Sequence, residues 1–194
     1  MLFTRRSFEP RATVRLAREL LGKVLVRRIG RKEIRAVITE TEAYHGLKDK
    51  ASHAARGKTK RNAPMWGAAG HWYVYFVYGN HWMLNLVTGP EEYPAAILIR
   101  GISKIKNQKS KFRRSASQTL IKNKDGVVSG PGRVAKFLKI DGSLSGRPAS
   151  RKTGLWIEDG GEKIKPSRIK AAARVGVNYA GKEWAGKKWR FKLL

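Results

Sequence analysis

The stretch WYVYFVYGNHWMLNLVT, residues 72–88, decides the fold. Its two halves are rich in aromatic and β-branched residues and are separated by Gly79 and Asn80, a pattern that predicts an antiparallel β-hairpin. Side chains alternate between the two faces of a strand, so the first half is expected to carry two distinct faces. One face should hold Tyr73, Tyr75 and Val77, and the other Trp72, Val74, Phe76 and Tyr78. Most of these side chains are expected simply to pack in a core, whereas Tyr78, beside the turn, is suited to wedging into a nucleic-acid groove.

Outward from the hairpin, the hydrophobic periodicity predicts several more elements. Strands are expected at Lys23–Ile29, Glu33–Tyr44, Ala95–Ile99 and Leu155–Ile157 and from Trp189, with an apolar run at Ala171–Val177. Helices are expected at Ala12–Leu21 and after Ser129, with Pro131 in the first turn, and a long surface loop at His45–Gly70. Arg100 is expected at the end of its strand. Helices and antiparallel strands without regular alternation favour an α+β fold, a single compact mixed domain over residues 1–194.

The charge of the chain predicts a polyanionic partner. Lys and Arg number 42 against 14 Asp and Glu, a formal net charge of +28, which a compact domain tolerates poorly alone. Hydrophobic residues make up 41% of the chain, so the charge is expected on the surface of a folded body. The stretch Lys104–Lys124 is basic and contains no acid, which indicates a solvated loop or a clamp that forms on DNA.

Several kinds of chemistry are not expected. The chain has no Cys, which excludes disulfides and thiol or iron–sulfur chemistry. Its four His residues form no HExxH motif, so no metal site is expected. No apolar run approaches the ~18 residues that a membrane span requires, and the first ten residues lack the apolar core of a signal peptide. A soluble, cytoplasmic protein with no membrane association is therefore expected.

Two acids stand out on the strand Glu33–Tyr44. The period of two places Glu40 and Glu42 on the face that also carries Ile34, Ala36 and Ile38, so either carboxylate could be partly buried. The alternative is an exposed strand end with two solvated acids. Between Glu42 and Glu91 the only acid is Asp49, amid many Lys and Arg residues. The presence of an acid beside a polyanion-binding face indicates a chemical role for that acid, such as the activation of water.

Eight short strings, found in family order over nearly the whole chain, carry a resemblance. They are ETEAY at 40–44, KRN at 60–62, YVYFVYGN at 73–80, MLN at 83–85, ILIR at 97–100, SGPGRV at 129–134, AAARVGV at 171–177 and WRF at 189–191. This pattern closely resembles the alkyladenine (3-methyladenine) DNA glycosylase family. The resemblance implies a largely antiparallel curved sheet with flanking helices and a protruding hairpin that inserts into the minor groove of DNA. It also implies a pocket for a flipped, alkylated or deaminated purine, and no cofactor.

The resemblance also implies roles for residues of the pocket. Glu42 is similar to the family's general base, which activates the attacking water, and Arg100 to the residue that helps to orient this site. Tyr44, His53 and Tyr75 are similar to the residues of the base pocket.

Further roles concern the contact with DNA. Tyr78 resembles the intercalating residue that fills the gap left by the flipped nucleotide, and Asn85 resembles a gate against the amino group of guanine. Arg61 is similar to a DNA-backbone contact. Asn80 and His81 depart from the bulkier apolar and aromatic residues of the family at the hairpin tip, so the range of lesions is left open. The implied partner is double-stranded DNA with damaged purines, bound by a monomer that is nucleoid-associated in a bacterium or nuclear in a eukaryote.

Two other interpretations fit parts of the sequence. A noncatalytic basic nucleic-acid-binding protein would explain the charge and the aromatic residues. A lyase that forms a lysine Schiff base is compatible with the many Lys residues. The string Glu40–Tyr44 favours a hydrolytic enzyme, because such an enzyme requires a carboxylate within an aromatic pocket.

Overall fold

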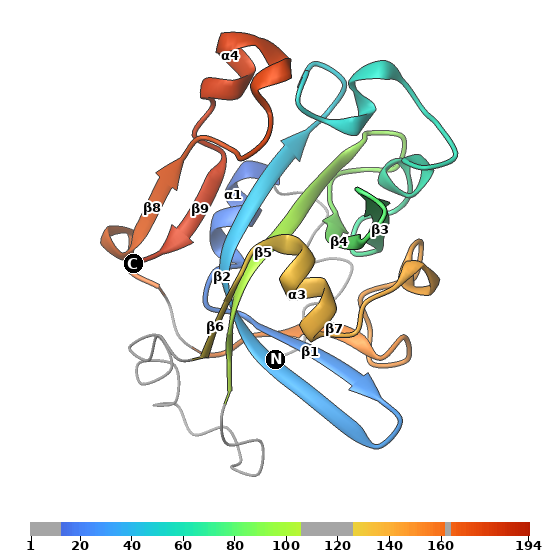
Figure 1. The fold of residues 1–194 in the computed structure, drawn as a ribbon, viewed down its shortest axis with the longest axis vertical. Coiled ribbons are helices and arrows are strands. Elements are labelled where there is room, and N and C mark those ends of the chain that lie inside the picture. The colour runs from blue at the N-terminus through green and yellow to red at the C-terminus, as the bar shows by residue number, and fades with distance from the viewer. Residues whose placement is uncertain (1–12, 106–125, 162–163) are drawn as a thin grey trace.

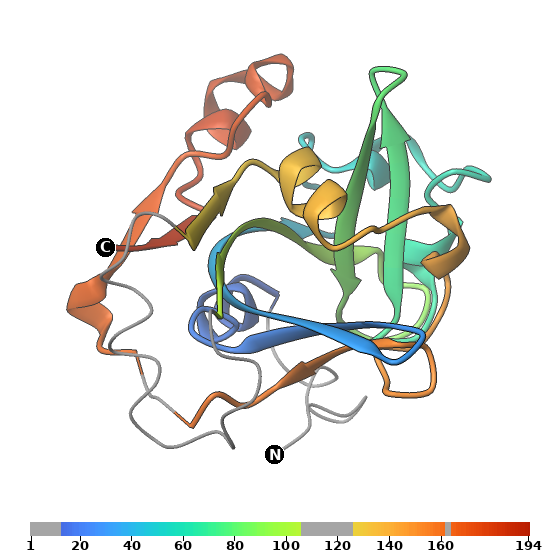
Figure 2. The same cartoon turned by 60° about the horizontal axis from the view of Figure 1, so that its bottom comes forward.

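A strongly curved antiparallel sheet forms the body of the molecule (Figure 1, Figure 2). In this computed structural model, residues 13–105, 126–161 and 164–194 are described. The strands of this part are β1 (Val24–Ile29), β2 (Lys32–His45), β3 (Trp72–Val77), β4 (His81–Val87), β5 (Ala95–Lys104), β6 (Val127–Ser129), β7 (Leu155–Glu158), β8 (Ile169–Ala172) and β9 (Arg190–Leu193). The main path of the sheet is β3-β4-β5-β2-β1-β7, while β6 pairs with β5, and β9 joins β8 to β2.

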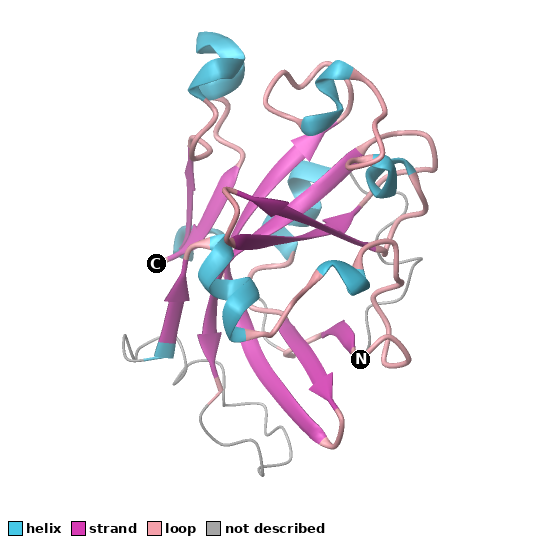
Figure 3. Cartoon of the chain, turned by 45° about the vertical axis from the view of Figure 1, so that its right-hand side comes forward, coloured by secondary structure: helices cyan, strands magenta, loops and turns pink. Residues whose placement is uncertain are grey.

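The helices are short, and strands make up most of the body (Figure 3). The described α-helices are α1 (Thr13–Glu19), α3 (Pro131–Phe137) and α4 (Gly181–Gly186). The 3-10 helices are η2 (His53–Arg56), η3 (Ala63–Trp66), η5 (Gly142–Leu144), η6 (Pro166–Arg168) and η7 (Asn178–Ala180). The predicted α+β class is confirmed. Among the described residues, no helix has the length and apolar character that crossing a bilayer would take.

The main core lies between α1, α3 and the sheet, where apolar side chains are removed from water. Leu16 on α1, Leu25 on β1 and Ile97 on β5 are all fully buried in it. Trp72 is also fully buried, and its indole N–H donates to the carbonyl of Leu155, 3.1 Å away. This contact ties the start of the β3–β4 hairpin to β7, while the hairpin tip projects from the body (Figure 2).

Most predicted elements are confirmed, with a few differences in extent. The helix predicted at Ala12–Leu21 is α1, the one after Ser129 is α3, and the loop His45–Gly70 carries η2 and η3. Only the first two residues of the run Ala171–Val177 lie in a strand, β8. The basic stretch Lys104–Lys124 lies outside the described residues after Ile105.

The predicted face of the two acids is wrong. Ile38 and Ala43 both lie in the main core although they are five positions apart, so strict alternation fails between them. Thr41 points to the core side, where its hydroxyl donates to the carbonyl of Ala17 on α1, 2.8 Å away. Glu40 and Glu42 therefore face away from the core that Ile38 enters.

Two compensating irregularities in the β2–β5 ladder cause this change of face. Ile38 pairs with Ile102, Glu40 with Gly101 and Thr41 with Ile99, so that Thr39 and Arg100 have no register partner across this ladder. A bulge of this kind turns the following side chains to the other face. Gly101 permits it, because an added Cβ there would lie 2.8 Å from the Cβ of Glu40. The sequence predicted Arg100 at the end of a strand, but β5 continues to Lys104, so Arg100 lies within the strand.

Candidate active site

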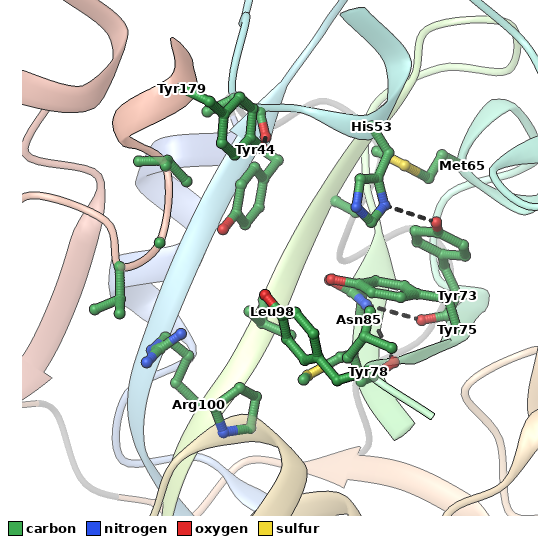
Figure 4. A pocket seen from close by; sticks show the side chains of 18 residues that line it. Tyr44, His53, Met65, Tyr73, Tyr75, Tyr78, Asn85, Leu98, Arg100 and Tyr179 are labelled. Carbon is green, nitrogen blue, oxygen red and sulfur yellow. Dashed lines mark hydrogen bonds between the residues drawn. The ribbon is translucent and has the colours of Figure 1, made fainter. Parts of the chain in front are cut away.

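A cavity of about 370 Å³ opens between the end of β2 and the β3–β4 hairpin (Figure 4). Its volume is typical of a small-molecule site. Met83, Ala96 and Leu98 of β4 and β5 contribute apolar lining. Polar and aromatic lining comes from Tyr44, His53, Tyr73, Tyr75, Tyr78, Asn85, Arg100 and Tyr179. Four of these residues, Tyr44, His53, Tyr75 and Asn85, are the predicted base-pocket residues, so the structure brings them together.

One side of the cavity is a cluster of aromatic rings, formed by His53, Tyr73 and Tyr75. The rings of Tyr73 and Tyr75 lie 5.0 Å apart between centroids, and the His53 ring lies 4.6 Å from Tyr75 at 72°. Nδ1 of His53 is 3.0 Å from the hydroxyl of Tyr73, which fixes the orientation of the imidazole (Figure 4). Burial, followed by the nearby charge of Arg61, lowers the pKa of His53, and burial raises the pKa values of both tyrosines. This side therefore presents neutral phenols and a neutral imidazole at neutral pH.

Tyr44 faces this aromatic cluster from the other side of the cavity (Figure 4). It comes from the end of β2, and its hydroxyl donates to Oε2 of Glu42, 2.9 Å away. Burial, together with the negative charge of Glu42, raises the pKa of Tyr44 well above its ordinary value. A planar ligand between Tyr44 and Tyr75 would thus contact two uncharged aromatic rings.

Glu42 lies directly behind the wall of the cavity. Its side chain is fully buried and does not itself line the cavity, but three of its partners do. The N–H of Val175 donates to Oε1 at 2.9 Å, the Tyr44 hydroxyl donates to Oε2, and Arg100 lies 3.4 Å from either oxygen. Burial raises the pKa of Glu42, and Arg100, the Val175 N–H, the Tyr44 hydroxyl and Arg190 oppose that rise. The carboxylate is thus held as a base of increased strength at the cavity wall.

Arg100 lies between two carboxylates. Its Nε is 3.3 Å from Oε1 of Glu40 and 3.4 Å from Oε1 of Glu42. Glu40 also contacts Nη1 of Arg190 at 3.5 Å and is not among the cavity-lining residues. Both acids bond to Arg100, which lines the cavity, but only Glu42 also accepts hydrogen bonds from the cavity-lining residues Tyr44 and Val175.

Asn85 lies on β4 of the hairpin and lines the cavity. It is almost fully buried, and its Nδ2 donates to the carbonyls of Tyr73 and Met83, 3.1 and 3.3 Å away. Because only the NH₂ group of the amide can donate to carbonyls, these bonds set which end of the side chain faces the backbone.

Tyr78 is placed differently from the sequence prediction. It follows the end of β3, has a φ of 53°, and lines the mouth of the cavity with Tyr75 and Val77 instead of sharing the face of Trp72. A positive φ in the turn interrupts the strand alternation from which its face was predicted. The residue is 89% exposed, so few contacts within the folded protein cover its ring.

The hairpin tip is braced by two further side chains. Nη2 of the exposed Arg61 donates to the carbonyl of Phe76 at 2.8 Å, and its guanidinium lies 5.1 Å from the ring centroid of Tyr75. His81 packs against the start of α3, where an added Cβ on Gly132 would lie 2.9 Å from the His81 ring. The backbone N–H of Asn80 donates to the carbonyl of Val77 at 3.2 Å and closes the turn.

Comparison with known proteins identifies the chain. Residues 7–194 match the family model described as methylpurine-DNA glycosylase (MPG). The chain belongs to the methylpurine-DNA glycosylase family. It is therefore a DNA glycosylase, an enzyme of DNA repair that acts on DNA, and the resemblance found in the sequence is confirmed.

Relatives of this glycosylase cover almost its whole length. A protein of Methanocella arvoryzae assigned as a 3-methyladenine DNA glycosylase is 41% identical over 178 residues, 92% of this chain and 86% of the relative. A protein of Desulfitobacterium hafniense with the same assignment is 39% identical, over 90% of this chain and 87% of the relative. Another, of Psychrobacter cryohalolentis, is 40% identical, over 90% of this chain and 84% of the relative.

Some pocket residues of the glycosylase are not apparent from sequence patterns. Val175 contributes a backbone N–H to Glu42, which no periodicity can reveal. Tyr179 on η7 lines the cavity, and its hydroxyl donates to the carbonyl of Ala51 at 3.0 Å. The only available signal for Tyr179 was a large aromatic residue in a polar, glycine-containing segment. Within the described parts of the chain, no group of three or more His, Asp or Glu side chains is placed to hold a metal ion.

Proposed function

We propose that this glycosylase hydrolyses the N-glycosidic bond of an alkylated or deaminated purine flipped out of duplex DNA, with a water molecule activated by Glu42. The observation that carries the proposal is the buried Glu42 carboxylate, bonded to groups of Tyr44, Val175 and Arg100 at the wall of an aromatic cavity. Such a cavity with a strengthened base is the arrangement expected for attack by water beside a stacked ligand.

Glu42 would act as the general base. The water oxygen forms a bond to C1′ of the sugar, its proton passes to Glu42, and the electron pair of the C1′–N bond leaves with the purine. The carboxylate also opposes the positive charge that develops on the sugar in the transition state. Arg100 would orient the carboxylate and keep it ionised, since its positive charge lowers the pKa that burial raises.

The base pocket would select planar, electron-poor rings. A cationic alkylated purine is attracted to the faces of neutral Tyr44 and Tyr75 and leaves without protonation. A neutral deaminated purine needs a hydrogen-bond donor, which the neutral His53 imidazole can supply. Asn85 would act as a gate that clashes with the amino group of guanine.

The hairpin would hold the distorted DNA. Tyr78, exposed at the tip, would fill the gap that the flipped nucleotide leaves, and this contact offsets part of the unstacking cost of a few kcal/mol. Arg61 beside the hairpin would contact the phosphate backbone. The glycosylase would act on its DNA substrate as a monomer.

The two other interpretations receive less support. A noncatalytic binder does not account for a fully buried carboxylate that is hydrogen-bonded to cavity-lining groups. A Schiff-base lyase needs a lysine at the reacting sugar, and none of the described residues that line the cavity is a lysine.

The test is direct. The protein is incubated without metal with duplexes that each contain one alkylated or deaminated purine, and free base and strand integrity are measured. We expect free base and an intact abasic strand, with Glu42→Gln binding lesion DNA but releasing base on the order of 1,000-fold more slowly. Glu40→Gln is the matched control and should retain most of the rate. A nicked strand would favour the lyase, and a Glu42→Gln variant as fast as the parent would refute the proposed base.

A further inference from the structure

A second pair of charges is buried beside the cavity. The side chains of Arg174, in the segment after β8, and Asp49, in the loop after β2, are both inaccessible to solvent. Nη1 and Nη2 of Arg174 donate to the two carboxylate oxygens of Asp49 at 2.5 and 2.8 Å, a bidentate geometry. The catalytic steps proposed above use neither residue.

The pair connects segments that are distant in sequence. Nη1 of Arg174 also donates to the carbonyl of Ala43 on β2 at 2.9 Å, and Nη2 to the carbonyl of Trp184 on α4 at 3.1 Å. Asp49 accepts the backbone N–H groups of His45 and Ala51, at 3.2 and 3.1 Å. The end of β2, the loop that leads to η2 and the C-terminal segment are thereby held together at one point.

Two groups of the proposed active site depend on this point directly. The Arg174 guanidinium lies 4.9 Å from the ring centroid of Tyr44 and 5.1 Å from that of Trp189, so it supports the ring of Tyr44, which lines the cavity. The next residue in the chain is Val175, whose N–H donates to Oε1 of Glu42. A displacement of Arg174 would therefore move both hydrogen-bond donors, Tyr44 and Val175, that hold the two oxygens of Glu42.

Stability alone does not account for a buried charge pair at this position. The cost of removing two charges from water largely cancels their attraction, and well-packed apolar residues in their place are often equally stable. What an apolar pair cannot supply is four directed N–H donors that fix three chain segments relative to one another. The benefit of the pair is then the fixed geometry of these three segments.

We infer that Arg174 and Asp49 form a positioning pair, which sets Tyr44 and the Val175 N–H against Glu42 and so controls the strength and orientation of the base. This inference rests on the proposed role of Glu42. Arg174 is a positioning residue, because its own contacts are with protein groups and not with the reacting atoms.

The pH dependence of the reaction should report this role. The groups that face Glu42 are Arg100 from β5, Arg190 from β9, the Tyr44 hydroxyl from β2 and the Val175 N–H, with Glu40 on the other side of Arg100. Arg100, Arg190, the Tyr44 hydroxyl and the Val175 N–H each favour the ionised carboxylate. Loosening the Tyr44 and Val175 contacts therefore raises the pKa of Glu42. Because the base acts in its ionised form, the rise of rate with pH should then occur at higher pH.

The decisive variant is Arg174→Met with Asp49→Leu, which replaces the pair by apolar side chains. Single-turnover base release is measured at saturating enzyme over a range of pH, on a duplex with one cationic alkylated purine, together with the temperature of thermal unfolding. We expect a variant that is folded at the assay temperature although its unfolding temperature is lower, because the backbone groups bonded to the pair lose those partners. Its rate should be lower on the order of 100-fold, and its rate rise should be displaced to higher pH. Arg35→Lys is the control, since Arg35 forms an ion pair with Glu158 at the other end of β2, and it should match the parent profile.

The alternatives are distinguishable. A stable double variant with the parental rate and pH profile overturns the inference, and so does a lower rate with an undisplaced profile. If the double variant does not fold, Arg174→Lys decides by the same criteria, because it keeps the charge but loses the bidentate geometry. If the parent releases no base, or Glu42→Gln equals it, the proposed function itself has failed.

Discussion

Replacing Tyr78 by Asn should separate the capture of lesions in duplex DNA from the chemistry of base release. Tyr78 has a φ of 53°, a left-handed conformation that Asn tolerates better than most residues, so the backbone of the turn is preserved. The substitution removes only the ring at the hairpin tip. Tyr78→Phe is the matched control, because it keeps the ring and removes only the hydroxyl.

The size of the effect follows from the exposure of the ring. Because Tyr78 is 89% exposed in the free protein, most of its ring is available to stack against bases, and little of it contributes to folding. Stacking of a base on an aromatic side chain contributes about 1–3 kcal/mol, so a loss of about 2 kcal/mol corresponds to about 30-fold slower capture. The free energy of unfolding should change by less than about 0.5 kcal/mol.

The assay compares one lesion strand in duplex and single-stranded form. At subsaturating enzyme in single turnover, Tyr78→Asn should lower the duplex rate about 30-fold while the single-strand rate stays near that of the parent, because a single strand leaves no gap to fill. Tyr78→Phe should leave both rates unchanged. Equal losses on the two substrates for Tyr78→Asn would refute the wedge role.

Three further predictions concern the pocket. Burial raises the pKa of Glu42 in the folded state, so the stability linked to this group is present at acidic pH and is lost as pH rises through the raised pKa. Glu42→Gln should thus unfold at a higher temperature than the parent near neutral pH, and a thermal series should show this difference vanishing toward acidic pH. Tyr73→Phe removes the hydroxyl bonded to His53 and should slow release of a neutral deaminated purine about fivefold, with a smaller effect on a cationic one; equal effects would contradict a hydrogen-bonding role for His53. Excess chelator should leave base release unchanged, and a lost activity restored by added metal would contradict a metal-free reaction.

Local sequence patterns predicted much of the fold because their causes are local. The hairpin Trp72–Val87 followed from two β-forming runs around Gly79, and the apolar period and Pro131 located α3. The separation of Tyr73 and Tyr75 from the buried face of Trp72 needed only the alternation of a strand, which is regular there.

The placement of the acids could not be predicted in this way. Glu42 faces the cavity side because Thr39 and Arg100 have no register partner in the β2–β5 ladder, and Gly101 allows β2 to approach closely. The bulge depends on how two strands pair, and the sequence of β2 alone does not show where its alternation shifts. The sequence prediction placed Tyr78 on the wrong face for a related reason. Tyr78 has a positive φ, so the strand alternation ends at Val77, one residue before it.

By itself, the sequence determined the strand and helix types, the cationic surface and the family, because each depends on residue identity or on short spacings along the chain. Only the tertiary structure decided that Tyr44, Val175 and Arg100 meet around Glu42, and that Arg174 and Asp49 are buried together behind them. The physical reason is burial. A carboxylate becomes a stronger base, and an ion pair becomes a fixed joint between segments, only when distant parts of the chain exclude water from both.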